Sequence, residues 1–250
     1  MFPYKDENPT ELTPVVTLGI IAVNAMVWLL VQGLGADESL ARSVCQLGLI
    51  PGEVLRTVPP GTSVPLGPGV HCVLTADAHW STVLTSMFMH GGWFHIIGNM
   101  WFLWVFGNNI EDSMGHARFV VFYLLCGVAA AGAQMVVAPR SVVPMVGASG
   151  AISGVMGAYT LLYPRVRVHT LVTLGFFVTT VTLPAYVMLG YWFVLQLLMG
   201  AVGALSPTEG GVAVWAHVGG FLTGLLLVKL FANPEFLERR RAGVFLPRDA

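Results

Sequence analysis

Apolar runs of about twenty residues recur along the whole of this 250-residue chain. A helix of that length crosses the roughly 30 Å hydrocarbon core of a bilayer, so such runs are typical of membrane spans. Of all residues, 55% are hydrophobic and only 10% are charged, and the charges gather between the runs. The sequence therefore predicts an all-α polytopic membrane protein, and its net charge of −1 gives no indication of nucleic-acid binding.

The runs predict one membrane domain, residues 15–231, built as a bundle of six transmembrane helices. The predicted spans are residues 15–34, 93–110, 119–138, 146–163, 184–205 and 212–231. Short tails, 1–14 and 232–250, lie on one side of the membrane, and residues 35–90 form a long first loop on the other side. Nine of the 12 Lys and Arg residues fall on the side of the tails. By the positive-inside rule, both tails are cytoplasmic and the first loop is extracytoplasmic.

Segment 169–183 is apolar and rich in Thr and Val, and it could form a seventh span. At roughly fourteen residues it is short for a spanning helix, and its β-branched residues disfavour a helix. We therefore expect an interfacial or re-entrant connection.

The first tail bears on the location of the protein, and the location in turn bears on its cysteines. Residues 1–14 lack the features of a signal or transit peptide, and no further domain is evident, which favours a bacterial plasma membrane. Cys45 and Cys72 share the first loop. They form a disulfide if that loop faces an oxidising compartment, but two unpaired thiols fit the sequence equally well.

Four polar residues fall within the predicted spans, where an unpaired polar group is costly. His95 and Asn99, in "HGGWFHIIGN", are spaced i, i+4 on one helix face, Ser149 opens the fourth span and His217 opens the sixth. Spans two, four and six run in the same direction, so all four residues lie at a similar depth near the outer surface. A seventh span at 169–183 would move His217 to the opposite side from Ser149.

Small residues on the fourth and sixth spans predict close contact between these helices. The glycines with the required spacing are Gly150, Gly154, Gly220 and Gly224. Each residue also has a structural explanation: serine and glycine usually serve packing, asparagine can join helices, and histidine can relay protons or bind a metal. The convergence of Ser149, His217 and the His95/Asn99 pair at one depth favours a catalytic site instead.

Ser149 and His217 have the chemistry of a nucleophile and its general base. The predicted spans contain no Asp or Glu, so the pair would act as a dyad, and the absence of an HExxH motif disfavours a zinc protease and gives no metal site. The Ser149 N–H, His95 and Asn99 would form an oxyanion hole. Gly147 and Gly150, on either side of Ser149, allow a substrate backbone to approach.

The motifs "HGGWFHIIGN", "GASG" and "AHVGGFLTG", in this order, resemble those of the rhomboid intramembrane serine proteases over about residues 80–230. The resemblance implies an intramembrane serine endopeptidase without a cofactor, with Ser149 as nucleophile, His217 as base, and His95 and Asn99 in the oxyanion hole. His90 matches a further family histidine with a structural role. The implied partners are the lipid bilayer and single-span membrane proteins, which are cut at a small residue after local unwinding.

The same resemblance implies that the first loop is partly embedded in the outer leaflet and that residues 206–213 cover the site. Two positions depart from the family pattern. Trp80 is followed by Ser81 where many relatives have arginine, and Ser153 replaces an aromatic residue that packs on the histidine in some relatives. The alternatives are a non-proteolytic protein of this fold that binds or escorts membrane helices, and a transporter. Proteins of the first kind usually lack the serine or the histidine, and a transporter would need polar residues that continue to the inner face.

Overall fold

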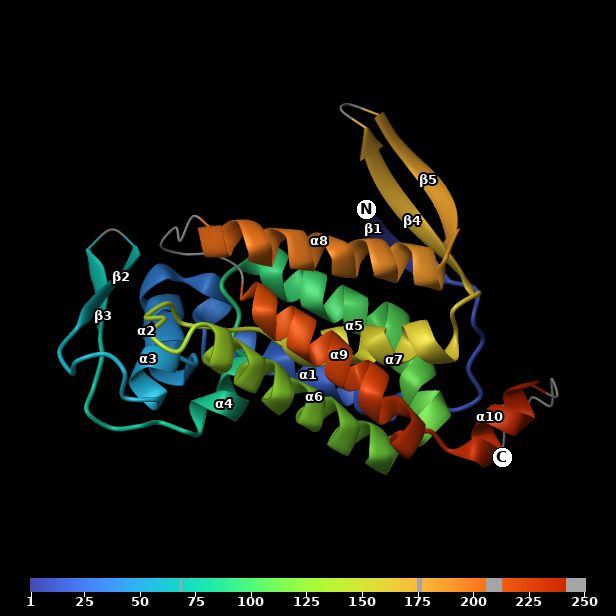
Figure 1. Cartoon of the computed structure of the whole chain (residues 1–250), viewed down its shortest axis with the longest axis horizontal. Helices are drawn as coiled ribbons and strands as arrows, with labels where there is room; N and C mark the ends of the chain where they lie inside the picture. Colours follow the sequence, from blue (N-terminus) through green and yellow to red (C-terminus); the bar gives the residue numbers. More distant parts are fainter. Residues whose placement is uncertain (68, 175–176, 206–212, 242–250) are drawn as a thin grey trace.

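Long parallel and antiparallel helices form the body of the protein. The computed structural model describes residues 1–67, 69–174, 177–205 and 213–241. The long helices are α1 (Val15–Leu30), α5 (Trp93–Met114), α6 (His116–Val137), α7 (Ser149–Leu162), α8 (Ala185–Leu205) and α9 (Val214–Phe231). They follow the long axis of the molecule, and the short helix α10 (Pro234–Arg241) comes after α9 (Figure 1).

Within the described residues, three helices are long and apolar enough to cross a membrane. These are His116–Val137, Ala185–Gly203 and Val214–Phe231, and the apolar helices α1 and α7 are shorter. A helix suits a lipid environment because it satisfies its own backbone hydrogen bonds. The structure is therefore mostly helical, as predicted, while the count of six spans stays a prediction.

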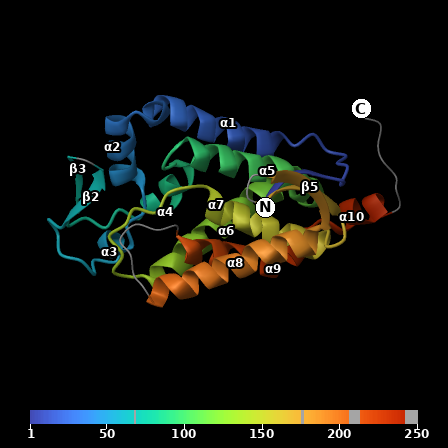
Figure 2. The same cartoon turned by 90° about the horizontal axis from the view of Figure 1, so that it is seen from above.

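Helix α7 lies at the centre of the bundle. Every residue from Gly150 to Tyr159 is buried, and α1 and α8 lie on opposite flanks of the bundle (Figure 2). Such burial on all sides requires small residues wherever a neighbouring helix approaches closely.

The ends of two helices, α1 and α5, differ from the ends of their predicted spans. Helix α1 ends at Leu30 instead of 34, because the residues of the following turn, Gly33–Gly35, all have positive φ. Helix α5 continues past residue 110 to Met114 and so includes the buried carboxylates Glu111 and Asp112. The prediction that no Asp or Glu lies within a spanning helix is thus wrong for α5, because this helix is longer than the predicted span.

Glu111 has a structural partner at the start of α1. Its carboxylate oxygens accept hydrogen bonds from the Val16 N–H at 2.9 Å and from the Thr17 N–H and hydroxyl at 2.8 and 2.7 Å. The two N–H groups are backbone donors that the first turn of a helix leaves without a partner. Glu111 is about 24 Å along α5 from His95, at the other end of the bundle.

The prediction of an all-α fold is wrong, because segment 167–184 is a β-hairpin. Strands β4 (Arg167–Leu174) and β5 (Phe177–Pro184) pair antiparallel, and β1 (Phe2–Asp6) adds to β4, in the order β1-β4-β5. The hairpin rises from the bundle beside α8 (Figure 1). Thr and Val, which disfavour a helix, suit a strand well. The segment is therefore a connection and not a helical span.

The first tail is tied to the helices as well as to the hairpin. The Trp101 indole N–H donates to the Pro3 carbonyl at 2.8 Å, and the Tyr159 hydroxyl donates to Asp6 at 2.5 Å. Asn109 donates to the same Asp6 carboxylate oxygen at 2.9 Å. Residues 1–14, expected as a simple tail, therefore pack against α5 and α7.

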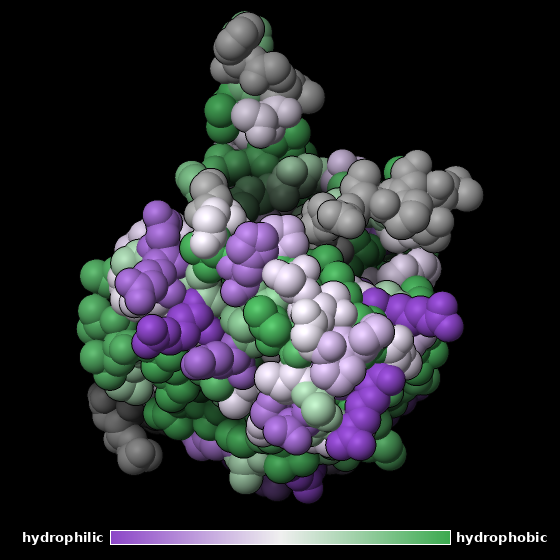
Figure 3. Space-filling model, turned by 90° about the vertical axis from the view of Figure 1, so that its left-hand side faces the viewer, coloured by the Kyte–Doolittle hydropathy of each residue, from purple (hydrophilic) through white to green (hydrophobic). Residues whose placement is uncertain are grey.

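Segment 31–92 covers one end of the bundle. It contains α2 (Asp37–Leu47), α3 (Pro51–Val54), β2 (Ser63–Gly67), β3 (Val70–Val73) and α4 (Thr82–Thr85). A disulfide joins Cys45 to Cys72, so of the two readings of these cysteines the bonded one is found. Polar side chains gather at the centre of this end, and hydrophobic side chains border it (Figure 3). Such a border suits a polar end between helices that face lipid.

Helices α7 and α9 approach so closely that only glycine fits at their contact. A Cβ at Gly220 would lie 2.0 Å from the Gly150 carbonyl oxygen, and a Cβ at Gly224 would lie 1.9 Å from that of Gly154. Gly157 faces the Phe221 carbonyl oxygen in the same way, at 2.2 Å. The close approach expected from the glycine spacing is thus observed.

The substitution Gly224→Ala tests this contact. The added methyl would meet backbone, which cannot move alone, so we expect a loss of about 1–3 kcal/mol in stability and a lower thermal midpoint in detergent. Gly190→Ala, on α8, is the matched control because nothing lies within 4 Å of its Cβ, and the better helix former should leave the midpoint equal or higher. Equal midpoints for both variants would contradict the argument.

Candidate active site

The contact between α7 and α9 brings Ser149 against His217. Ser149 is the first residue of α7, and His217 lies in the first turn of α9. The Ser149 Oγ is 2.8 Å from the His217 Nε2, a hydrogen-bond distance, and both residues are partly exposed. As the first residue of a helix, Ser149 has a backbone N–H without an acceptor inside the helix.

The His95 side chain, on α5, approaches Ser149 from the other side of Gly147. Gly147 has a φ of 118°, and the position that a Cβ of Gly147 would occupy is 2.6 Å from His95 Nε2 and 3.6 Å from Ser149 Oγ. His95 Nδ1 accepts the Gly91 N–H at 3.2 Å. In a neutral imidazole the other nitrogen then carries the proton, so Nε2–H is a donor beside Ser149. Only glycine suits position 147, because its φ is positive and because a Cβ there would overlap the His95 ring.

Asn99 and His90 flank His95. The Asn99 side chain is 7% exposed, and its amide donates to the His95 carbonyl at 2.9 Å, one turn back on the same face of α5. The His90 ring meets the His95 ring edge to face, with centroids 5.2 Å apart. Gln32 exchanges two hydrogen bonds with the His90 backbone, both at 2.8 Å. This arrangement fixes the turn that leads into α5.

Helix α8 contacts His217 through two residues that were not predicted from the sequence to belong to the site. The Gln196 Oε1 is 2.9 Å from His217 Nδ1, and the Trp192 ring packs on the imidazole with centroids 5.8 Å apart. Ser153, one turn along α7, donates to the Ser149 carbonyl at 2.6 Å. Gln196 could have been singled out from the sequence, because it is the only residue with a side-chain amide in Ala185–Leu205.

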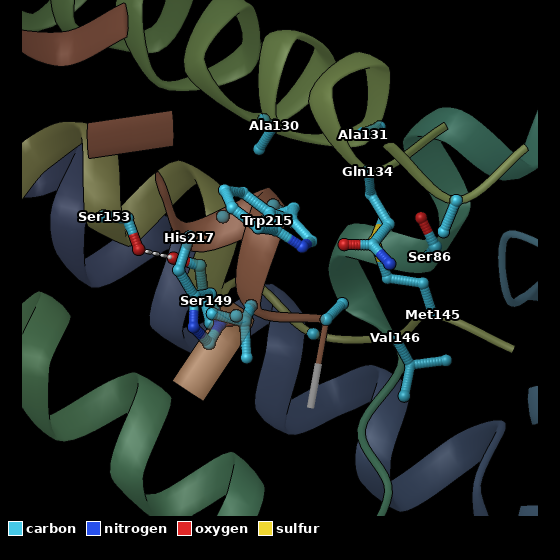
Figure 4. A pocket seen from close by; sticks show the side chains of 18 of the residues that line it. Ser86, Ala130, Ala131, Gln134, Met145, Val146, Ser149, Ser153, Trp215 and His217 are labelled. Carbon is cyan, nitrogen blue, oxygen red and sulfur yellow. Dashed lines mark hydrogen bonds between the residues drawn. The ribbon is translucent and has the colours of Figure 1, made fainter. Parts of the chain in front are cut away.

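Most of the candidate residues, but not His90, line one cavity of about 1740 Å³ between α5, α6, α7, α8 and α9. Ser149, Ser153 and His217 lie together on one side of this cavity, and Gln134, Ser86 and Met145 lie on the other, with Trp215 between them (Figure 4). His95, Asn99, Gly147 and Gly150 also line it, whereas Gly220 and Gly224 serve the contact of α7 with α9. The predicted cover, 206–213, lies outside the described residues except for Ala213.

The family of the protein follows from its similarity to known proteins. The model of the Rhomboid domain matches residues 77–234, more than half of the chain. The chain belongs to the rhomboid family. With its apolar helices, this rhomboid-family chain is an integral membrane protein.

Its relatives come from plants, bacteria and animals. The chain is 29% identical over 162 residues to rhomboid-like protein 11, chloroplastic, of Arabidopsis thaliana (62% of this chain, 53% of that protein). It is 29% identical over 162 residues to rhomboid protease GluP of Bacillus subtilis (65% and 28%). It is 31% identical over 156 residues to the human mitochondrial presenilin-associated rhomboid-like protein (59% and 37%). The match thus spans about half or less of the length of these relatives.

His90 makes the stability of this rhomboid-family chain dependent on pH. Burial, together with the neighbouring His95, lowers the pKa of His90 to about 3. Below about pH 6.5 the unfolded chain therefore binds a proton that the folded chain does not, and stability falls by about 1.4 kcal/mol per pH unit as the pH decreases toward 3.

The variant His90→Gln should remove this contribution. We expect its thermal midpoint in detergent to fall less than that of the unmodified protein between about pH 7 and about pH 5. The same substitution at the exposed His71 is the control and should change the pH dependence little. A His90→Gln variant with an unchanged pH dependence would contradict the prediction.

Proposed function

We propose that this protein is an intramembrane serine endopeptidase that hydrolyses peptide bonds in or near the transmembrane segments of other membrane proteins. The observation that carries the proposal is the 2.8 Å contact between Ser149 Oγ and His217 Nε2. Two further findings support it: the match to the Rhomboid domain, and the similarity to a relative that is named a protease.

In the first step, the Ser149 Oγ attacks the carbonyl carbon of the scissile bond. His217 Nε2 takes the hydroxyl proton as the new C–O bond forms, because a serine hydroxyl is a weak nucleophile until a base removes its proton. When the tetrahedral intermediate collapses, the C–N bond breaks and His217 returns that proton to the leaving amine.

The oxyanion of the intermediate needs fixed donors. The Ser149 backbone N–H is free within its helix, and the Nε2–H of His95 lies beside Gly147, next to Ser149. Asn99, one turn along α5, adds a side-chain amide that lines the same cavity. Such preorganised donors are most effective where little water screens them.

In the second step, water hydrolyses the acyl-enzyme. His217 takes a proton from the water, the hydroxide oxygen bonds to the acyl carbon, and Ser149 leaves with its proton restored. No cofactor or metal takes part in the proposed cycle. The water reaches the site from the outer face, because Ser149 begins the helix at the end that segment 31–92 covers.

The substrates that we propose are single-span membrane proteins held in the bilayer. A cavity of about 1740 Å³ exceeds the roughly 300–1,000 Å³ typical of small-molecule sites, so it suits an unwound polypeptide segment. The substrate would be cut at a small residue.

We further propose that α1 and α5 to α9 are the six spans, with both ends of the chain cytoplasmic. Ser149 is then near the extracytoplasmic face, and Cys45–Cys72 lies in the segment at that same end. Disulfides persist in oxidising compartments, which supports a site that faces outward. The membrane that we propose is a bacterial plasma membrane.

Labelling with a fluorophosphonate probe tests the activated serine. We expect the purified protein to gain the mass of a single adduct, and both Ser149→Ala and His217→Ala to lose it, since one removes the nucleophile and the other its base. Intact mass measures the outcome. Ser113→Ala is the control and should label like the unmodified protein, because Ser113 bonds Ile110 in the last turn of α5, away from the cavity.

Absence of an adduct in the folded, unmodified protein would overturn the protease proposal and favour the non-proteolytic alternative. An adduct that persists in Ser149→Ala would place the reactive hydroxyl elsewhere in the chain.

The oxyanion hole predicts a second set of effects. His95→Ala and Asn99→Ala should each lower the labelling rate by about 10²- to 10³-fold, because each removes a donor to the charged intermediate. Rates are followed by adduct mass over time, with thermal midpoints measured in parallel. A variant that keeps the full rate would exclude that residue from the oxyanion hole.

A further inference from the structure

Gln196 completes a chain of hydrogen bonds that runs through three helices. It lies on α8, is 9% exposed, and its Oε1 is 2.9 Å from His217 Nδ1 on α9. On the other side of the same ring, Nε2 is 2.8 Å from Ser149 Oγ on α7. Among the hydrogen bonds of the described residues, no carboxylate contacts His217.

The direction of the Gln196 bond decides which nitrogen of His217 is basic. A neutral imidazole carries one proton. If Nδ1–H donates to the Gln196 oxygen, Nε2 presents a lone pair to the Ser149 hydroxyl. If the Gln196 amide instead donated to Nδ1, the proton would sit on Nε2, and His217 could not take a proton from serine.

A second residue on the same face of α8 holds the plane of the ring. Trp192, four residues before Gln196, packs on the imidazole and also contacts Phe221 at 6.2 Å between centroids. Phe193 stacks on Phe221 at 4.5 Å. The ring is therefore supported from its face by Trp192 and from its edge by Gln196, and both supports come from α8.

We propose that Gln196 is a positioning residue: its Oε1 accepts the His217 Nδ1–H and thereby directs the basic Nε2 toward Ser149. The amide does here what a carboxylate does in a catalytic triad, without a buried negative charge, which would be costly in a membrane. The inference rests on the proposed function of Ser149 and His217.

Two substitutions separate this role from packing. Gln196→Met keeps the shape of the side chain but removes the acceptor, whereas Gln196→Glu keeps an oxygen that can accept. Each variant of the full chain in detergent is labelled with the fluorophosphonate probe over a range of concentrations, which separates the maximal labelling rate from the probe's affinity. Asn24→Leu, which removes a buried amide from α1, is the matched control.

We expect Gln196→Met to lower the maximal rate by about tenfold to a hundredfold, the loss expected for one buried hydrogen bond, with the probe affinity unchanged. The unpaired Nδ1–H should also lower the thermal midpoint, so the rates are compared at a temperature at which both proteins are folded. Gln196→Glu should keep most of the rate, and Asn24→Leu all of it. A Gln196→Met variant that labels at the full maximal rate would overturn the inference and leave the proposed function standing. An unmodified protein that does not label would overturn both.

The protonated nitrogen gives a second readout that packing alone would not move. In ¹⁵N-histidine-labelled protein, long-range proton–nitrogen NMR spectra distinguish the two neutral tautomers, and the spectrum of His217→Ala assigns the signal. We expect the proton on Nδ1 in the unmodified protein and a shift toward Nε2 in Gln196→Met. A proton on Nε2 in the unmodified protein would overturn the inference.

Discussion

The contact between α7 and α9 is the interaction on which the rest of the molecule depends. A Cβ at Gly220 or Gly224 would overlap the carbonyl oxygen of Gly150 or Gly154, so no other residue leaves room for this approach. Close backbone packing replaces the hydrophobic driving force that is missing between helices in lipid. The same approach sets the Ser149 hydroxyl at hydrogen-bond distance from His217.

The polar groups of the molecule gather at its two ends and serve different purposes. At one end, Glu111 and Asp6 bind the start of α1 and the first strand to the helices through buried hydrogen bonds. At the other end, Ser149 and His217 form a hydrogen bond with each other, and together with His95 they line a cavity. Polar groups between membrane helices are costly, which is why the groups that line a cavity point to chemistry and those that tie segments together point to structure.

A large part of the candidate site could be predicted from the sequence, because its residues stand at helix starts and at helical spacings. His95 and Asn99 share a face by their i, i+4 spacing, and the glycines beside Ser149 signal a close helix. Gln196 and Trp192 were missed because nothing within α8 shows which neighbour its single amide will meet. The three-stranded sheet was missed for a similar reason: β pairing depends on a partner strand, and β1, which pairs with β4, comes from the far end of the chain.

The sequence by itself determined the apolar character of the chain, the family motifs and which polar residues are candidates for the site, since these follow from residue type and local spacing. Only the tertiary structure decided how those groups are oriented. It brought Gln196 to the Nδ1 of His217, turned His95 so that its Nε2–H faces Gly147, and gave Glu111 a capping role at α1. The physical reason is that a hydrogen bond is directional and joins atoms from distant segments, so its geometry exists only once the helices have packed.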